Sequence, residues 1–276
     1  MNYRHAFHAG NFADVHKHWI LSLLLRRLAA KDKPFFVLDS HAGAGFYDLA
    51  REETGRTGEA ANGIGRLIDL DEPPPSLGPY LAAIRGLNPE GGLRWYPGSP
   101  WLISHFLRPQ DRLAAVEAHE EQSALLRATL RDAPNARAYA RDGYDAIPSL
   151  LPPKERRGLT LIDPPYEDRT EVARIAKAVA DGMKRFATGS VAIWYPIKTH
   201  MLGDALAEDL PPAERGRIRC EIWVRPTDRE DAGLTGSGVI LLNPVWPVQD
   251  TIAAEQPALA ALLAKEDGAG SRIVSF

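Results

Sequence analysis

Apolar positions near the start of the chain follow first a helical spacing and then a strand pattern. From Phe12 they recur every three or four residues through Leu28, which predicts a helix that ends near "AAKDK". The short apolar run from Phe35 to Leu38 predicts a buried strand, and the glycine-rich turn "HAGAG" follows it. This order is typical of the opening unit of a doubly wound α/β sheet.

The same alternation resumes after residue 97. Further helices are predicted for "GSPWLISHFL", "EEQSALLRATLRDA" and "EVARIAKAVADGMKRF". Further strands are predicted for "RLAAVE", "ARAYARDG", "GLTLIDPPY" and "SVAIWYP". Two later apolar runs, "RIRCEIWVR" and "SGVILLNPVW", have no helix between them, so we expect an antiparallel pair that closes the sheet edge.

These patterns predict an α/β, Rossmann-like fold over a single domain, residues 1–276. Residues 1–32 form an N-terminal motif and helix. Residues 48–96 interrupt the alternation, because they are polar, rich in glycine and punctuated by proline, and we expect an inserted helical subdomain there.

Composition narrows the classes of protein and partner. Lys and Arg number 33 against 36 Asp and Glu, so any contact with nucleic acid must come from a local basic patch. The single cysteine, Cys220, excludes an intrachain disulfide and a thiolate zinc site, and it fits a reducing cytoplasm. No apolar run is long enough for a membrane span and the start does not resemble a signal peptide, so we expect a cytoplasmic protein.

Acidic residues follow four of the predicted strands. Asp39 ends the first, Glu117 the second, Asp142 with Gly143 the third, and Asp163 the fourth. Ligands of such sheets bind at the carboxyl ends of the strands, although any one of these acids can equally cap the next helix.

The strand-end acids suit a nucleoside without a phosphate requirement. Asp48 stands where a dinucleotide fingerprint has its third glycine, which disfavours NAD. Glu117 can accept from both hydroxyls of a ribose, and Asp142 can accept from an adenine amine. S-adenosylmethionine fits this description.

The stretch "DPPY", residues 163–166, predicts the chemistry. An adenine amine is a poor nucleophile until its lone pair is localised and aimed at the methyl group. Asp163 and the carbonyl of Pro164 can accept its two N–H groups, Pro165 makes the turn rigid, and Tyr166 offers a stacking face. "NPVW", residues 243–246, is similar but lacks the second proline, and we interpret it as a strand stop.

Four of the eight histidines fall within the first 18 residues. A metal site is disfavoured, because His16 and His18 are two apart on a helix and point to different sides, and no set of cysteines completes a site. The alternative is a polar N-terminal cap that lines a pocket for substrate and cofactor.

The chain resembles the RlmJ family, ribosomal RNA large subunit methyltransferase J, along nearly its whole length. The similar stretches are "YRHAFHAGNFADVHKH", "LDSHAGAG", "YPGSP", "RDG", "RRGLTLIDPPYE", "KRFATG" and "WYP". The resemblance implies a Rossmann-like methyltransferase with a helical insertion, which uses S-adenosylmethionine and no metal. It implies methylation of N6 of an adenine in 23S ribosomal RNA.

The resemblance also implies roles for individual residues. Asp163 would be the catalytic acceptor and Tyr3 a contact to the target base or its RNA. His5 and Lys17 lie in the matching N-terminal motif, and we place them on the substrate side. The cofactor would be bound by His18, His41, Ser99, Glu117, Asp142, Gly143 and Asp163. The departure is "NPVW", where the family tends to carry a second proline.

Two other functions stay open. A DNA adenine-N6 methyltransferase would use the same tetrapeptide but would have to flip its base out of a duplex. A noncatalytic RNA-binding module would have no need of Asp163 as an amine acceptor. RNA binding is expected to weaken with salt through Arg4, Lys17, Arg51 and Arg56. The RNA loop recognised and the oligomeric state stay open, with a monomer favoured.

Overall fold

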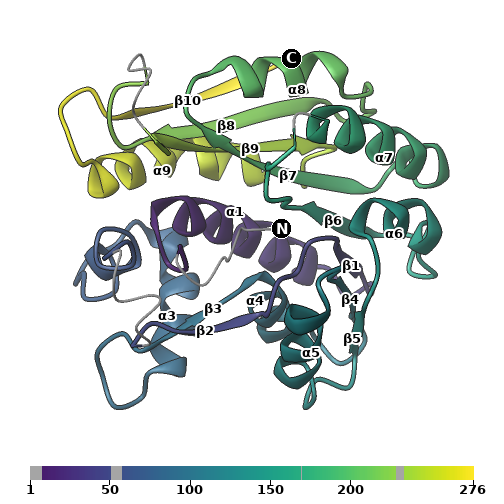
Figure 1. Ribbon diagram of the computed structural model, residues 1–276, viewed down its shortest axis with the longest axis horizontal. Coiled ribbons are helices and arrows are strands. Elements are labelled where there is room, and N and C mark those ends of the chain that lie inside the picture. Colours follow the sequence, from purple (N-terminus) through teal and green to yellow (C-terminus); the bar gives the residue numbers. More distant parts are fainter. Residues whose placement is uncertain (1–7, 51–57, 169, 228–232) are drawn as a thin grey trace.

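The computed structural model describes residues 8–50, 58–168, 170–227 and 233–276. Its centre is an eight-stranded sheet (Figure 1). In sheet order the strands are β10 (Gly270–Ser275), β8 (Arg217–Trp223), β9 (Gly236–Leu242), β7 (Ser190–Ile197), β6 (Gly158–Ile162), β1 (Phe36–Asp39), β4 (Arg112–Val116) and β5 (Ala136–Tyr139).

The sheet is parallel in one part and antiparallel in the other. β7, β6, β1, β4 and β5 run parallel, as the alternating pattern predicts. The predicted antiparallel pair, β8 with β9, is confirmed. The prediction that this pair closes the sheet edge is wrong, because β10 pairs with β8 and forms the edge itself.

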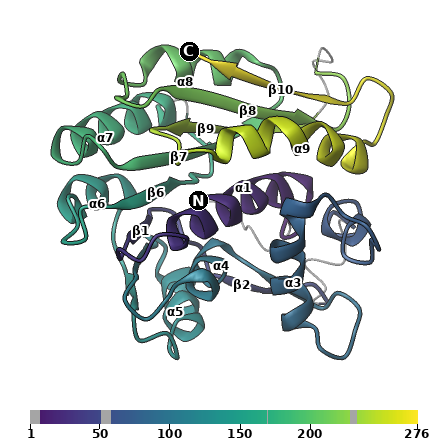
Figure 2. The same ribbon diagram turned by 180° about the vertical axis from the view of Figure 1, so that it is seen from behind.

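Helices cover both faces of the sheet (Figures 1 and 2). One face carries α1 (Phe12–Ala29), α4 (Ser99–Phe106), α5 (Glu120–Thr129) and α9 (Val248–Leu263). The other carries α6 (Gly143–Leu150), α7 (Glu171–Arg185) and α8 (Met201–Asp209). Successive strand residues alternate between the two cores, Val37 packing in the first and Leu38 in the second. This is the doubly wound, Rossmann-like arrangement.

Helix α1 lies between the sheet and the segment that precedes β3 (Figure 1). Fifteen of its eighteen residues are buried, including the polar His16, Lys17 and His18. Asn11 caps the helix, since its side chain accepts from two backbone N–H groups of the first turn. Buried polar groups require partners, so the partners of these three side chains bear directly on function.

The segment between β1 and α4 holds short elements. β2 (Phe46–Asp48) and β3 (Trp95–Pro97) pair antiparallel, and the described residues between them include two 3₁₀ turns, η2 (Ile64–Arg66) and η3 (Pro75–Leu77), and the helix α3 (Gly78–Leu87). Treating residues 48–96 as an inserted unit, and 1–32 as a separate motif, stays a prediction. Within the described ranges, no helix is long and apolar enough to cross a membrane.

Candidate active site

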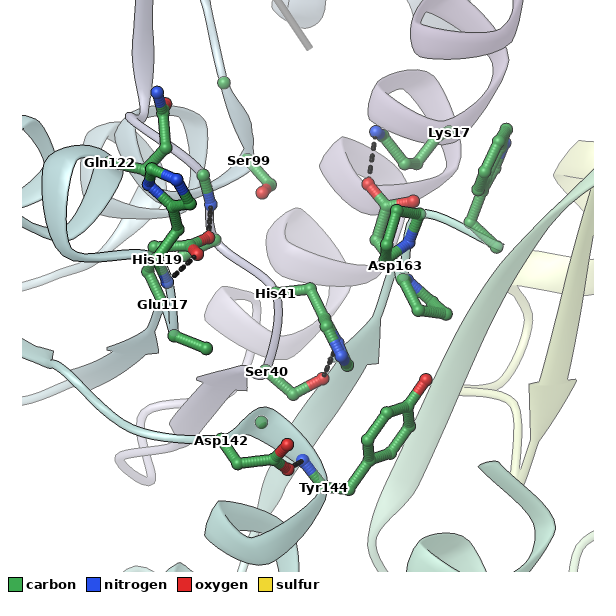
Figure 3. A pocket seen from close by; sticks show the side chains of 18 of the residues that line it. Lys17, Ser40, His41, Ser99, Glu117, His119, Gln122, Asp142, Tyr144 and Asp163 are labelled. Atoms are coloured by element: carbon green, nitrogen blue, oxygen red, sulfur yellow. Dashed lines mark hydrogen bonds and ion pairs between the residues drawn. The ribbon is translucent and has the colours of Figure 1, made fainter. Parts of the chain in front are cut away.

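A cavity of about 250 Å³ opens at the carboxyl ends of the parallel strands (Figure 3). The strands that carry the predicted acids are neighbours, in the order β6, β1, β4, β5, so their ends meet at one edge. The cavity is lined by every residue predicted to bind the cofactor: His18, His41, Ser99, Glu117, Asp142, Gly143 and Asp163.

Asp163 is paired directly with a lysine at the cavity wall (Figure 3). Lys17 Nζ lies 2.5 Å from Asp163 Oδ2 and 2.9 Å from Asp14 Oδ1, and the lysine side chain is only 5% exposed. Burial alone would lower the pKa of Lys17, but the two carboxylates together outweigh it and raise that pKa. Lys17 is therefore a buried, paired cation that lines the cavity beside Asp163 and Pro164.

Glu117 is held in place by the backbone. Its Oε2 accepts from the N–H of Gly43 at 2.9 Å, and its Oε1 accepts from the N–H of His119 at 2.7 Å. Each carboxylate oxygen has more than one lone pair, so both retain accepting capacity toward the cavity. This geometry suits a pair of vicinal hydroxyls.

Asp142 both caps a helix and lines the cavity. Its Oδ1 accepts from the N–H groups of Tyr144 and Asp145, which caps α6, and its Oδ2 pairs with Arg174 at 2.9 Å. The next residue must be small, because a Cβ on Gly143 would lie 2.0 Å from the carbonyl oxygen of Ser40. The segment that follows β5 therefore packs directly on the turn after β1.

Asp39 acts through Ser99. The Asp39 side chain is fully buried and does not line the cavity, and its Oδ2 accepts from Ser99 Oγ at 2.7 Å. Burial raises the pKa of Asp39 to about 7, although the hydrogen bond from Ser99 opposes that shift. Ser99, the first residue of α4, is thereby fixed at the cavity wall.

The histidines of the N-terminal region have separate partners. His18 Nδ1 lies 2.9 Å from Tyr96 Oη, whereas His16 contacts Ser237 and Gln256 away from the cavity. The prediction that His16 and His18 point to different sides is confirmed. Among the residues that the structure describes, no group of three or more His, Cys, Asp or Glu is arranged to hold a metal ion.

His41 lies in the turn after β1. Its Nδ1 is 2.9 Å from Ser40 Oγ, and its ring meets the edge of Tyr144 with centroids 4.8 Å apart. Burial lowers the pKa of His41 to about 4, so the ring is a neutral group of the cavity wall at neutral pH.

Tyr166 lies apart from the three motif residues before it, all of which line the cavity. Its hydroxyl donates to the carbonyl of Trp194 at 2.7 Å, and its ring stands edge-on to Trp194. Tyr166 does not line the cavity, so stacking of a base on its ring stays a prediction. Tyr3 and His5, the other predicted substrate contacts, lie outside the described residues, as do Arg4, Arg51 and Arg56.

The "NPVW" stretch lies away from the site. β9 runs antiparallel to β7, so its carboxyl end reaches the opposite edge of the sheet from Asp163. At that edge the side-chain amide of Asn243 donates to the carbonyls of Ala187 and Gly189, at 2.7 and 3.0 Å, in the turn that precedes β7. This placement favours the interpretation as a strand stop.

Several cavity residues had no assigned role from sequence. Tyr144 follows the predicted Gly143, and Trp194 lies in the "WYP" stretch, so both had a signal that was not used. Glu171 and Arg174 reach the cavity from α7, and only the three-dimensional packing of that helix brings them there.

The fold and this cavity define a Rossmann-like methyltransferase. Residues 32–275 match the family model described as "Ribosomal RNA large subunit methyltransferase D, RlmJ", and the chain belongs to that family. Two relatives named "Ribosomal RNA large subunit methyltransferase J", from Escherichia coli K12 and Haemophilus influenzae Rd, are each 41% identical to it over 100% of this chain and 98% of their own. A crystal structure of a Legionella pneumophila protein is 32% identical and superposes with a TM-score of 0.85, covering 97% of this chain and 98% of that one.

Proposed function

We propose that this protein transfers a methyl group from S-adenosylmethionine to the N6 amine of an adenine in 23S ribosomal RNA. The observation that carries the proposal is that Asp163 and Pro164 line the same cavity as Glu117 and Asp142. An amine acceptor thus lies beside groups suited to a nucleoside. The names of the two 41% identical relatives support ribosomal RNA as the substrate.

The residues of the cavity fit the cofactor. Glu117 can accept from the ribose hydroxyls and Asp142 lies at the end of the neighbouring strand, where it can accept from the adenine amine. Gly143 lets that strand end approach the turn after β1, and Ser99 and His18 lie on the α4 and α1 sides of the cavity. When bound, S-adenosylmethionine supplies an activated methyl group.

The motif residues prepare the target amine. Lys17 holds the Asp163 carboxylate through Oδ2, and we infer that the other oxygen accepts one N–H of the amine. The carbonyl of Pro164 accepts the second N–H, which turns the nitrogen lone pair toward the methyl carbon. S-adenosylmethionine would supply the methyl group and keep the electron pair of the broken C–S bond on its sulfur, while Asp163 would hold the amine from which one proton is then released.

The test is methyl transfer from radiolabelled S-adenosylmethionine to unmodified large-subunit ribosomal RNA, with duplex DNA in parallel and nucleoside analysis of the product. We expect label in N6-methyladenosine from RNA alone. Label in DNA would instead establish a DNA adenine methyltransferase, and no transfer despite binding of S-adenosylhomocysteine would favour a binding module.

A further inference from the structure

A chain of buried hydrogen bonds runs from the cavity wall into the core. Trp194 lines the cavity, and its Nε1 donates to Ser237 Oγ at 3.0 Å. Ser237 Oγ lies 3.0 Å from His16 Nδ1, and His16 Nε2 lies 3.2 Å from Gln256 Oε1. Ser237, His16 and Gln256 are all fully buried. The chain therefore links β7, β9, α1 and α9.

The partners of Gln256 set the direction of the bonds in this chain. The Gln256 amide donates to the carbonyls of Glu221 and Arg272, both at 3.1 Å, so its oxygen must accept from His16 Nε2–H. Burial lowers the pKa of His16 to about 4, which keeps the ring neutral and makes Nδ1 an acceptor. Ser237 Oγ accepts the indole N–H, which can only donate, and it donates to Nδ1 at 3.0 Å, which is nearer than its other acceptor, the carbonyl of Ala13 at 3.5 Å.

Both residues next to Ser237 in β9 are glycines that leave no room for a side chain. A Cβ on Gly238 would lie 2.0 Å from Cζ of Tyr195, and one on Gly236 would lie 2.4 Å from the carbonyl oxygen of Ile222. Both neighbours of Ser237 therefore pack directly against adjoining strands. The backbone of this short stretch is fixed on both sides, so the hydroxyl of Ser237 has a defined position relative to Trp194.

Trp194 lies among the groups that handle the target amine. Lys17 Nζ is 5.6 Å from the centroid of its ring, and Tyr166 meets it edge-on with centroids 6.0 Å apart while donating to its backbone carbonyl. An aromatic ring at this place offers a surface for a base beside Asp163. A ring already held in one orientation loses less conformational entropy when the base binds.

We propose that Ser237 and His16 are positioning residues that hold the Trp194 indole as a wall of the pocket for the target adenine. The proposal rests on the proposed function, because it takes an adenine of RNA as the occupant. It predicts that loss of this buried chain weakens RNA binding while leaving the cofactor site unaltered.

The first test is a double-mutant cycle of Ser237→Ala with Trp194→Phe. Ser237→Ala should raise the KM for ribosomal RNA roughly three- to tenfold, with the affinity for S-adenosylhomocysteine unchanged and the KM restored by Ser237→Thr. In the Trp194→Phe background it should add nothing to KM, because phenylalanine has no N–H to anchor. An equal rise in both backgrounds, or no rise in either, overturns the proposal.

The second test measures the wild-type protein and needs no turnover, and the variant Trp194→Phe serves only to assign the signal. In ¹⁵N NMR spectra, the indole N–H signal absent from Trp194→Phe identifies Trp194. We expect this N–H to exchange slowly with solvent and to shift when adenosine 5′-monophosphate is added as a stand-in for the target nucleotide. Fast exchange, or no shift, overturns the proposal, whereas a wild type that methylates no RNA overturns the proposed function.

Discussion

Lys17 is a buried cation enclosed by two carboxylates, Asp14 and Asp163. Breaking such a group by removing its cation leaves buried charge without compensation, which typically costs about 3–5 kcal/mol. We therefore expect Lys17→Met to lower the free energy of unfolding in urea by about that amount. The matched control is Lys177→Met, which removes an 80% exposed lysine paired with Asp181 and should change stability by less than about 1 kcal/mol. Equal effects of the two substitutions would contradict the buried-pair interpretation.

Asp163 is placed to act on the amine in the transition state. Asp163→Ala should keep the fold and reduce turnover roughly 10²-fold or more, because it removes an interaction that is needed when the methyl group is transferred. Single-turnover methylation of ribosomal RNA measures this rate, and circular dichroism checks the fold. A well-folded variant with a nearly normal rate would remove Asp163 from the mechanism.

Asp39 makes stability depend on pH in an unusual direction. Its folded-state pKa is raised by burial to about 7 from an ordinary value of 3.8, so between these values the folded protein holds a proton that the unfolded chain has lost. Asp39 therefore destabilises the protein progressively as pH rises from about 4 to 7. Asp39→Asn should become steadily more stable relative to wild type over that window.

Urea unfolding at a series of pH values tests this prediction. Taking the difference between variant and wild type cancels the opposite contributions of His16 and His41, whose pKa values burial lowers to about 4. Asp209→Asn, which removes an exposed carboxylate at the end of α8, is the matched control. If the difference in free energy of unfolding between Asp39→Asn and wild type does not change with pH, the Asp39 carboxyl of the wild type is ionised across the window.

At the scale of elements, the cavity depends on close contact between the end of β5 and the turn after β1. Gly143→Ala would place a Cβ 2.0 Å from the carbonyl oxygen of Ser40 and force these elements apart. We expect the affinity for S-adenosylhomocysteine in isothermal titration calorimetry to fall at least tenfold, about 1.4 kcal/mol. Gly86→Ala is the control, because a Cβ there meets open space within α3, and it should leave affinity unchanged. Equal affinities of the two variants would show that the contact is dispensable.

The sequence predicted the parallel part of the sheet well and its far end poorly. Short apolar runs followed by an acid identified the buried strands β1, β4 and β6, whereas β5, an edge strand with no buried residue, was identified by its place in the alternation of strands and helices. Helix α9 was not predicted, since Pro257 lies inside it and proline usually interrupts a helical pattern. Without α9, the return of the chain to pair β10 with β8 could not be foreseen.

The same limit applies to the site. Residues adjacent to strand ends could be found because strand direction places them at one edge. Arg174 and the buried Ser237 reach their places through packing between elements far apart in the chain, such as β9 against α1. Sequence spacing carries no information about such contacts.

For the whole molecule, RNA binding must rely on local charge, because the formal net charge is −3. The described residues bring together three cations from distant segments: Arg66 of η2, Arg225 after β8 and Lys265 after α9. Arg66 Nη1 donates to the carbonyl of Ala264 at 2.5 Å, and Lys265 Nζ lies 5.2 Å from the ring of Phe12, where α1 begins. Burial first, and then Arg225 and Arg66, lower the pKa of Lys265, whereas the nearby Glu59 raises it and only partly offsets them.

We expect this cluster to contact phosphates that flank the target. Replacing both Arg66 and Lys265 by alanine should then make the slope of log affinity against log salt shallower by about 2, because each lost phosphate contact releases fewer counterions. Fluorescence anisotropy with a ribosomal RNA fragment between about 50 and 200 mM salt measures this slope. The matched control replaces Lys177 and Lys184, which are exposed on α7 and paired with Asp181, and should keep the wild-type slope. If both double variants keep that slope, the phosphate contacts lie elsewhere on the molecule, and the N-terminal motif with Arg4 becomes the next place to test.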